Sequence, residues 1–250
     1  MPTDTSDLWL RPAEPGDAAA LAAVHVAARR AAPMPDPVHG EADVARWLAA
    51  RLETDEVWVA DLADHGVVGY ARLTPGWLDD LYVAPVAARR GVGGALLDLV
   101  KAREPDGFCL WVFASNTPAR AFYAAHGLVE LESTDGSANE EGAPDVRLAW
   151  PGPEPLRFLR GLVDDVDAQL GDLLARRAAL TRAIQPFKDT TRRDPGRERA
   201  VAEALATRAP ELGVERLERI AHAIITESLD AAAERTCVSV RPGNRSVSVA

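Results

Sequence analysis

The sequence predicts two folded parts, an α/β domain with a mixed sheet followed by an all-helical domain. Three observations carry this prediction. Strand-like and helix-like segments alternate up to Trp150, three prolines follow within residues 151–155, and the segments beyond them have the apolar spacing of helices. Proline fixes φ and removes a backbone donor, so residues 151–155 interrupt regular structure and form a linker. We place the domains at 1–150 and 156–236, with a tail at 237–250.

The first domain is expected to alternate strands with helices. Short apolar runs rich in valine, leucine and tryptophan indicate strands, and alanine-rich segments indicate helices. Strands are expected at 7–11, 57–60, 67–73, 78–83, 107–113 and 146–150. Helices are expected at 16–31, 41–53, 91–102 and 118–126. Strands joined by crossover helices are typical of an α/β layer fold.

The second domain is expected to hold three helices. Apolar residues at three- and four-residue spacings predict one long amphipathic helix over 156–184. Asp194 is a helix N-cap followed by proline, which predicts a second helix over 195–209, and a third follows over 214–234. Three helices with one very long member make a poor core for one chain, so we expect a homodimer. The tail at 237–250 fits either a hairpin or a frayed end.

Composition excludes several classes of protein. The chain is 47% hydrophobic and 26% charged, which is ordinary for a soluble globular protein and not for a disordered or collagen-like one. A net charge of −10 argues against nucleic-acid binding, although a local arginine cluster can still bind small anions. The two cysteines, Cys109 and Cys237, have no metal-ligand spacing. Without a membrane-length apolar run or a signal peptide, we expect a cytoplasmic protein with no metal, nucleic-acid or membrane partner.

A loop rich in arginine and glycine joins a predicted strand to a predicted helix at residues 83–97. Glycine lets the backbone approach a ligand closely, and the first N–H groups of a helix are free to bind an anion. The loop is therefore either a phosphate-binding loop or an ordinary strand–helix turn.

A second motif follows about 23 residues later. Asn116 lies at a strand end, Pro118 starts a helix, Tyr123 lies within that helix, and Gly127 ends it. The combination of the two motifs at this spacing resembles the GNAT family of acetyl-CoA-dependent N-acyltransferases, over about residues 8–150.

The GNAT resemblance implies a role for each of these residues. Val83 would pair with the pantetheine arm of acetyl-CoA, Asn116 would bind CoA, and Tyr123 would protonate the leaving thiolate, whose proton affinity is close to that of a phenol. One residue departs from the family pattern, since Ala88 replaces a glutamine or arginine. The CoA pyrophosphate would lie on the backbone amides of Arg89, Arg90, Gly91, Val92, Gly93 and Gly94.

The general base that would deprotonate the amine is not evident from the sequence. Asp79 and Asp80, on the strand that leads to Val83, are candidates. They fit equally well as a charged strand end in solvent.

In the helical domain, arginines interrupt rows of apolar residues. Arg177 and Lys188 are eleven residues apart and so project from nearly the same helix face. Arg160, seventeen residues before Arg177, projects about a quarter turn away and suits a pocket in a partner chain. With these residues, the motif Asp194-x-x-Arg197-Glu198 and the later Ile-Ile-x-x-Ser228 resemble an AroQ-type chorismate mutase, over residues 156–234.

The mutase resemblance implies that Arg177 and a partner's Arg160 bind the two carboxylates of chorismate, supported by Arg197 and Ser228. Guanidinium groups grip carboxylates bidentately, which holds the chair conformer needed for the [3,3] rearrangement. Lys188 would stabilise charge on the ether oxygen, and Glu198 and the Asp194 region would bind the ring hydroxyl. No cofactor is implied for this reaction.

Two departures from the mutase pattern leave the reaction open. Ala232 stands where the family has glutamine or glutamate, and Pro186 lies two residues before Lys188. The leading hypothesis is therefore a chorismate mutase, converting chorismate to prephenate, fused to an acetyltransferase of unknown acceptor. The alternatives are a 4-amino-4-deoxychorismate mutase, an isochorismate pyruvate lyase, or a non-catalytic regulator that senses CoA or an aromatic metabolite.

Overall fold

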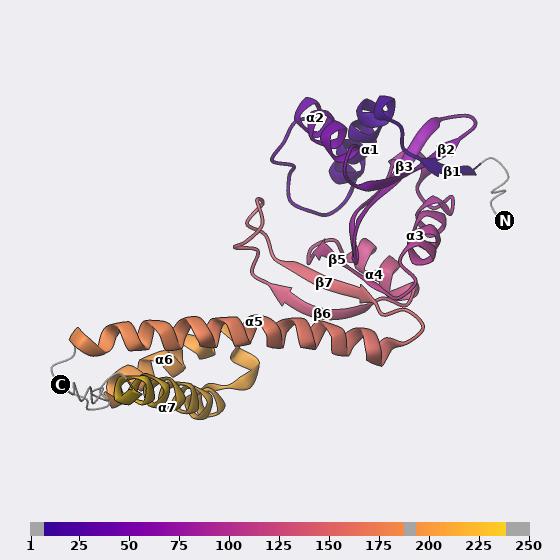
Figure 1. Ribbon diagram of the computed structural model, residues 1–250. Helices are drawn as coiled ribbons and strands as arrows, with labels where there is room; N and C mark the ends of the chain where they lie inside the picture. Colours follow the sequence, from indigo (N-terminus) through magenta and orange to yellow (C-terminus); the bar gives the residue numbers. More distant parts are fainter. Residues whose placement is uncertain (1–7, 188–193, 239–250) are drawn as a thin grey trace, which may run out of the picture. The chain divides into compact units, whose positions relative to one another are not determined.

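The protein folds as two compact units, Met1–Gly161 and Leu162–Ala250 (Figure 1). The structure is a computed structural model that describes residues 8–187 and 194–238. The boundary between the units falls within helix α5 (Pro155–Ile184), so the first turns of this helix belong to the first unit.

The first unit is built on a mixed seven-stranded sheet with the order β1-β2-β3-β4-β5-β7-β6. The pair β4–β5 is parallel, and every other neighbouring pair is antiparallel. The strands are β1 (Leu8–Pro12), β2 (Glu56–Leu62), β3 (Gly66–Thr74), β4 (Trp77–Val83), β5 (Phe108–Phe113), β6 (Val129–Thr134) and β7 (Asp145–Trp150). The predicted α/β class is confirmed, and β6 is a strand that the sequence did not predict.

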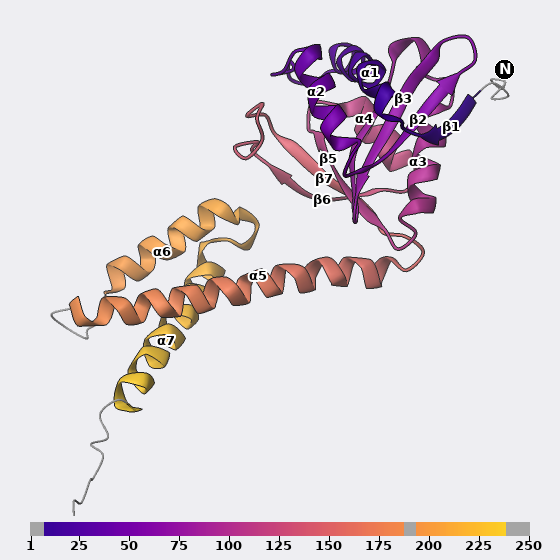
Figure 2. The same ribbon diagram turned by 45° about the horizontal axis from the view of Figure 1, so that its top comes forward.

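Four helices cover the two faces of this sheet (Figure 2). Helices α1 (Ala18–Ala31) and α2 (Glu41–Arg51) pack with one buried cluster, which includes Val59 and Tyr70 of the sheet. Helices α3 (Val92–Arg103) and α4 (Thr117–Ala125) pack with the other cluster. Short 3-10 turns at Pro15–Asp17 and Pro85–Ala87 precede α1 and α3.

The centre of the sheet opens between β4 and β5. These parallel strands pair at Trp77 and Cys109, near the start of both strands, where the Cys109 N–H also donates to the Gly76 carbonyl at 2.9 Å. Beyond this point β4 continues its pairing with β3, and β5 continues its pairing with β7. The two strands therefore separate, and the side chains between them line a cavity.

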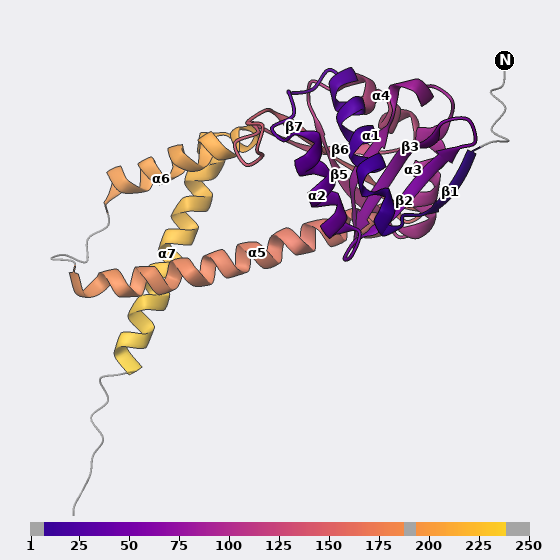
Figure 3. The ribbon, with the colours of Figure 1, turned by 90° about the horizontal axis from the view of Figure 1, so that it is seen from above.

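The second unit consists of helices, as expected (Figure 3). It contains most of α5, a 3-10 turn at Gln185–Phe187, α6 (Pro195–Arg208), a 3-10 turn at Pro210–Leu212, and α7 (Val214–Val238). Pro186 ends the long helix by a 3-10 turn. Helices α6 and α7 pack together, and Ala202, Leu217 and Ala221 are buried.

Helix α5 has no buried residue. Its exposed apolar side chains, at helical spacing, include Leu156, Val163, Val166, Leu170, Leu173, Leu174, Leu180 and Ile184. One chain thus leaves the apolar face of its longest helix open to solvent.

Two expectations fall outside the part of the chain that the structure describes. Lys188 lies outside it, and so do residues 239–250 of the expected tail.

Within the described residues, no helix has the length and apolar character needed to cross a membrane, and no group of His, Cys, Asp or Glu is arranged to hold a metal ion.

Candidate functional site

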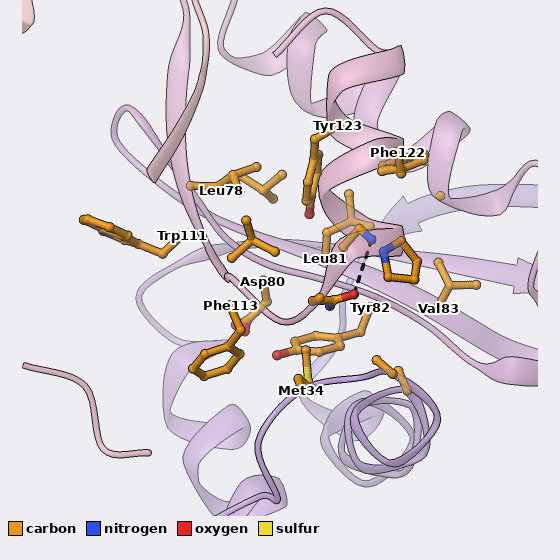
Figure 4. A pocket seen from close by; sticks show the side chains of 18 of the residues that line it. Met34, Leu78, Asp80, Leu81, Tyr82, Val83, Trp111, Phe113, Phe122 and Tyr123 are labelled. Carbon is orange, nitrogen blue, oxygen red and sulfur yellow. Dashed lines mark hydrogen bonds between the residues drawn. The ribbon is translucent and has the colours of Figure 1, made fainter. Parts of the chain in front are cut away.

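A cavity of about 990 Å³ lies where β4 and β5 separate (Figure 4). Residues from both strands line it, together with the arginine–glycine loop, helix α4, the segment after α1, and the loop between β6 and β7. The cavity collects several residues that the sequence singled out: Val83, Arg89, Gly91, Gly93, Gly94, Asn116 and Tyr123.

The arginine–glycine loop enters α3 through two residues of positive φ. Gly91 has a φ of 83° at the N-cap of α3, and Arg89 has a φ of 61°, which is uncommon for a residue with a side chain. The first N–H groups of a helix have no partner within that helix, so the start of α3 offers donors at the cavity wall.

Two of the predicted loop residues do not line the cavity. The Arg90 guanidinium lies 3.9 Å from the Asp64 carboxylate, and the Val92 side chain is buried in the core. Arg90 and Val92 were predicted to bind the CoA pyrophosphate through their backbone amides, and this role does not require their side chains to line the cavity.

Asn116 has a structural task at the cavity wall. Its side-chain oxygen accepts a hydrogen bond from the Ala119 N–H at 3.3 Å, which caps α4. This bond occupies the carbonyl end of the amide, and the NH₂ group is the end that remains for a ligand.

Tyr123 is buried and lines the same cavity. Its hydroxyl is drawn toward the interior of the pocket in Figure 4. Burial, with the nearby Tyr82 and Asp80, raises the pKa of this phenol above its ordinary value. Tyr123 therefore keeps its proton at neutral pH, as a general acid requires.

The two candidate bases have different surroundings. Asp80 is buried, so it is not a solvent-exposed strand end, and it accepts a hydrogen bond from Nε of Arg72 at 2.5 Å. Burial raises the pKa of Asp80, and the Arg72 guanidinium opposes this effect. Asp79 is exposed and accepts a hydrogen bond from the Thr74 hydroxyl.

The cavity also has residues that sequence reasoning missed. These are Met34 after α1, Trp111 and Phe113 on β5, and Asp145 at the start of β7, and they share no motif. An aromatic residue within a strand or an acidic residue at its start is too common to single out Trp111, Phe113 or Asp145, and Met34 belongs to no pattern.

In the second unit, Arg177 on α5 reaches Ser228 on α7. The Arg177 guanidinium donates to Ser228 Oγ at 2.6 Å and to the Ile224 carbonyl at 3.2 Å. The Ser228 hydroxyl in turn donates to the same carbonyl at 2.6 Å. The fold thus brings together two predicted site residues that lie 51 positions apart.

The other predicted mutase residues are distributed differently. Asp194 caps α6 by accepting from the Arg197 N–H at 3.0 Å. Glu198 lies 3.6 Å from His222 of α7. Arg160 is exposed and belongs to the first unit.

Comparison with known proteins supports both halves of this description. A model of the GNAT acetyltransferase domain matches residues 53–130, and a model of type II chorismate mutase matches residues 159–232. A peptidyl-lysine N-acetyltransferase, YiaC of Escherichia coli, is 34% identical over 105 residues, which are 41% of this chain and 68% of the relative. The chain belongs to the GNAT acetyltransferase family. It joins this acetyltransferase domain to a type II chorismate mutase domain.

Further relatives match the acetyltransferase domain. A mycothiol acetyltransferase of Mycobacterium avium is 35% identical over 111 residues, which are 42% of this chain and 35% of the relative. The crystal structure of a GCN5-related N-acetyltransferase from Rhodopseudomonas palustris is 29% identical with a TM-score of 0.49, and the match covers 57% of this chain and 94% of that one. The solution structure of apo YjaB from Escherichia coli is 19% identical with a TM-score of 0.48, covering 58% and 98%.

The family assignment gives the cavity a ligand class. A GNAT domain uses acetyl-CoA. The arginine–glycine loop, Asn116 and Tyr123 line the cavity of this domain and fit such a ligand chemically, since they offer anion-binding amides, an amide donor and a protonated phenol.

Proposed function

We propose that the protein is a bifunctional enzyme, in which the helical domain converts chorismate to prephenate and the α/β domain transfers an acetyl group from acetyl-CoA to an amine. The observation that carries the mutase half is the contact between Arg177 and Ser228 within the domain that matches type II chorismate mutase. The functional boundary is proposed at the proline-rich linker 151–155.

In the mutase domain, Arg177 would bind a carboxylate of chorismate with help from the Ser228 hydroxyl. Ser228 already orients the guanidinium before substrate arrives, so little freedom is lost on binding. Lys188 would stabilise the negative charge that develops on the ether oxygen, and Arg197 and Glu198 would bind the remaining groups. The rearrangement breaks the C–O bond as it forms a C–C bond, with no proton transfer.

We propose that the active mutase is a homodimer in which α5 is exchanged. The apolar face of α5 has no cover within one chain, and burying such a face drives association. In the dimer, Arg160 of a second copy would bind the other carboxylate. Within this proposal the product serves aromatic amino acid synthesis through the shikimate pathway, and a cytoplasmic location stays a prediction.

In the acetyltransferase domain, the amine would attack the thioester carbonyl of acetyl-CoA. The new C–N bond forms as the C–S bond breaks, the amine gives up a proton, and the thiolate takes one from Tyr123. Asp80 is the proposed acceptor of the amine proton, because burial makes its carboxylate a stronger base. The CoA pyrophosphate would lie on the amides from Arg89 to Gly94, with Asn116 as a further donor.

The alternatives differ in their products. Ala232 is buried where the mutase family has a polar side chain, which favours keeping the amino and iso forms of chorismate as candidate substrates. A regulator that only senses its ligands would bind them without turnover.

Product analysis separates these readings. The full-length protein is incubated separately with chorismate, isochorismate and 4-amino-4-deoxychorismate, and the products are resolved by chromatography. Formation of prephenate from chorismate supports the proposal. If chorismate gives no product while isochorismate gives pyruvate, the result supports the lyase. Binding of chorismate in calorimetry, without any product from the three substrates, supports the sensor.

A further inference from the structure

The end of the acetyltransferase cavity away from the arginine–glycine loop differs in chemistry from the loop end. Figure 4 shows Trp111, Phe113 and Asp80 on one side of the pocket and Val83 and Phe122 on the other. Since β4 runs from Trp77 to Val83 into the loop, its earlier residues lie farther from the proposed pyrophosphate site. This acceptor end is where the amine would enter.

Carboxylates outnumber cations at the acceptor end. The Arg72 guanidinium is shared by three carboxylates, those of Asp55 at 2.7 Å, Asp80 at 2.5 Å and Asp79 at 3.7 Å. Two of these residues, Asp79 and Asp80, line the cavity. Even with Asp80 protonated, Asp55 and Asp79 together carry more charge than the Arg72 guanidinium that they share, and Asp79 lines the cavity.

A fourth carboxylate lines the cavity from β7. Asp145, at the start of β7, accepts hydrogen bonds from the Thr134 hydroxyl and from the Asn139 amide, and neither donor is charged. Its negative charge is therefore solvated by neutral groups and not cancelled. Arg29, whose charge also acts on Asp80, is paired with Glu141 at 2.7 Å, so this cation brings its own counter-charge.

Aromatic faces accompany these carboxylates. Trp111 and Phe113 of β5 line the cavity, with Tyr82 on β4. Trp111 is 42% exposed, so part of its ring is open to a ligand at the cavity. A cation is attracted to such a face as well as to a carboxylate.

The walls of the acceptor end are tied to each other. Helix α1, the segment after it and the loop between β6 and β7 all line the cavity. Arg29 of α1 pairs with Glu141 of this loop at 2.7 Å, and His39 Nε2 of the segment lies 2.9 Å from Glu140. An acceptor with an extended arm would reach past these contacts into the cavity.

We propose that the acceptor amine is carried on an extended arm with a second positive charge nearby and no carboxylate. This inference rests on the proposed acetyltransferase function and names the substrate class for that site. The chemistry is shared by a free aliphatic diamine and by a lysine side chain in a basic stretch of polypeptide. The loop end of the same cavity attracts the anionic cosubstrate, so each end selects its ligand by the sign of the charge.

A series of three amines tests the proposal. Cadaverine, pentylamine and aminovalerate share one chain length and carry a cation, no charge or a carboxylate at the far end. With acetyl-CoA saturating, we expect kcat/KM to fall in that order, by about tenfold or more from first to last, and the difference to shrink as salt is added. An equal or reversed order would overturn the proposal, as would acetyl-CoA binding with no amine acetylated.

Removing the charge of Asp145 tests whether this carboxylate contributes to the preference for a second cation. Asp145→Asn should reduce the preference for cadaverine over aminovalerate several-fold. Asp135→Asn removes the same charge from the exposed part of the same loop, outside the cavity, and should keep the preference. If Asp145→Asn fails to fold, the salt dependence of the wild-type series decides, and a preference indifferent to salt contradicts the proposal.

The source of the amine is distinguished by two capped peptides, in which one lysine lies beside arginine or beside glutamate. The arginine peptide should be the better acceptor of the two. If the arginine peptide has a higher kcat/KM than cadaverine, the amine belongs to a polypeptide. If cadaverine has the higher kcat/KM, the amine belongs to a free diamine. A preference for the glutamate peptide would count against the inference, and failure of acetyl-CoA to bind in calorimetry would overturn the proposed function itself.

Discussion

At the scale of single residues, His25 shows how the interior of the acetyltransferase domain depends on pH. It is buried in α1, and its Nδ1 lies 2.8 Å from the Tyr70 hydroxyl. Burial, with the charges of Arg29 and Arg72, lowers the pKa of His25 from 6.5 to about 4. The imidazole of His25 is therefore neutral in the folded protein at neutral pH.

The neutral His25 stabilises the fold above pH 6.5, and this contribution is lost as the pH falls to about 4. His25→Gln cannot titrate and should remove up to about 3 kcal/mol of the pH dependence of unfolding in this window. Urea unfolding of both proteins at several pH values measures it. Parallel curves for the two proteins would show that His25 is not the group responsible.

Tyr123 tests the proposed acid of the acetyl transfer. Tyr123→Phe keeps the ring but removes the proton that the thiolate needs, so kcat should fall by about 10²-fold or more. Affinity for acetyl-CoA should stay within a few-fold in calorimetry. A kcat close to wild type would assign the proton to another group.

The sequence predicted the site residues that belong to local motifs and missed those that the fold brings together. Gly91, Asn116 and Tyr123 belong to local motifs with a fixed spacing, and all three line the cavity. Trp111 and Asp145 reach the same cavity only because β5 and β7 pair, and no local pattern marks that meeting. Asp80 was a candidate, but its burial and its bond to Arg72 needed the fold.

At the scale of elements, the separation of β4 from β5 is what makes the cavity. The sequence predicted both strands, but not that their pairing ends near Trp77 and Cys109. Strand β6 was missed because it lies at the sheet edge, where Val129 and most of its neighbours are exposed, so no buried face imposes an alternating pattern. Elements with a buried face were predicted well for the same reason.

The start of β5 is packed against the first turns of α5. Gly107 has a φ of 118°, and a Cβ there would lie 2.5 Å from Cδ2 of Phe158 and 2.8 Å from the Trp150 carbonyl oxygen. Gly107→Ala should therefore destabilise the acetyltransferase domain by roughly 2–3 kcal/mol, from backbone strain and overpacking.

Gly66→Ala is the matched control for this change. Gly66 has a φ of 67°, but a Cβ there meets no atom within 4 Å, so only the backbone strain, about 1 kcal/mol, is expected. Thermal unfolding measures both variants. Equal losses would mean that the contact with Phe158 contributes nothing.

At the scale of the whole molecule, the exposed apolar face of α5 is the surface that the proposed homodimer would bury. Leu170 is 47% exposed in the middle of this face. Leu170→Asp places a charge in the proposed dimer interface, so it should convert a dimer into monomers and lower the mutase rate. Sedimentation measures the mass.

Gln169→Asp is the control for Leu170→Asp, because it adds the same charge at the neighbouring exposed, polar position. It should leave the mass unchanged. A wild-type protein that sediments as a monomer while it turns over chorismate would rule out the exchanged helix.

Arg177, held by Ser228, is the proposed carboxylate ligand of chorismate, and kcat/KM for chorismate in two neighbouring arginine variants tests this role most directly. Arg177→Ala should lower kcat/KM by about 10²-fold or more, because a desolvated carboxylate loses its charged partner. Arg176→Ala removes the same charge one position away and should stay within a few-fold of wild type. Equal activity of the two variants would contradict the account, and so would a wild-type protein that forms no prephenate.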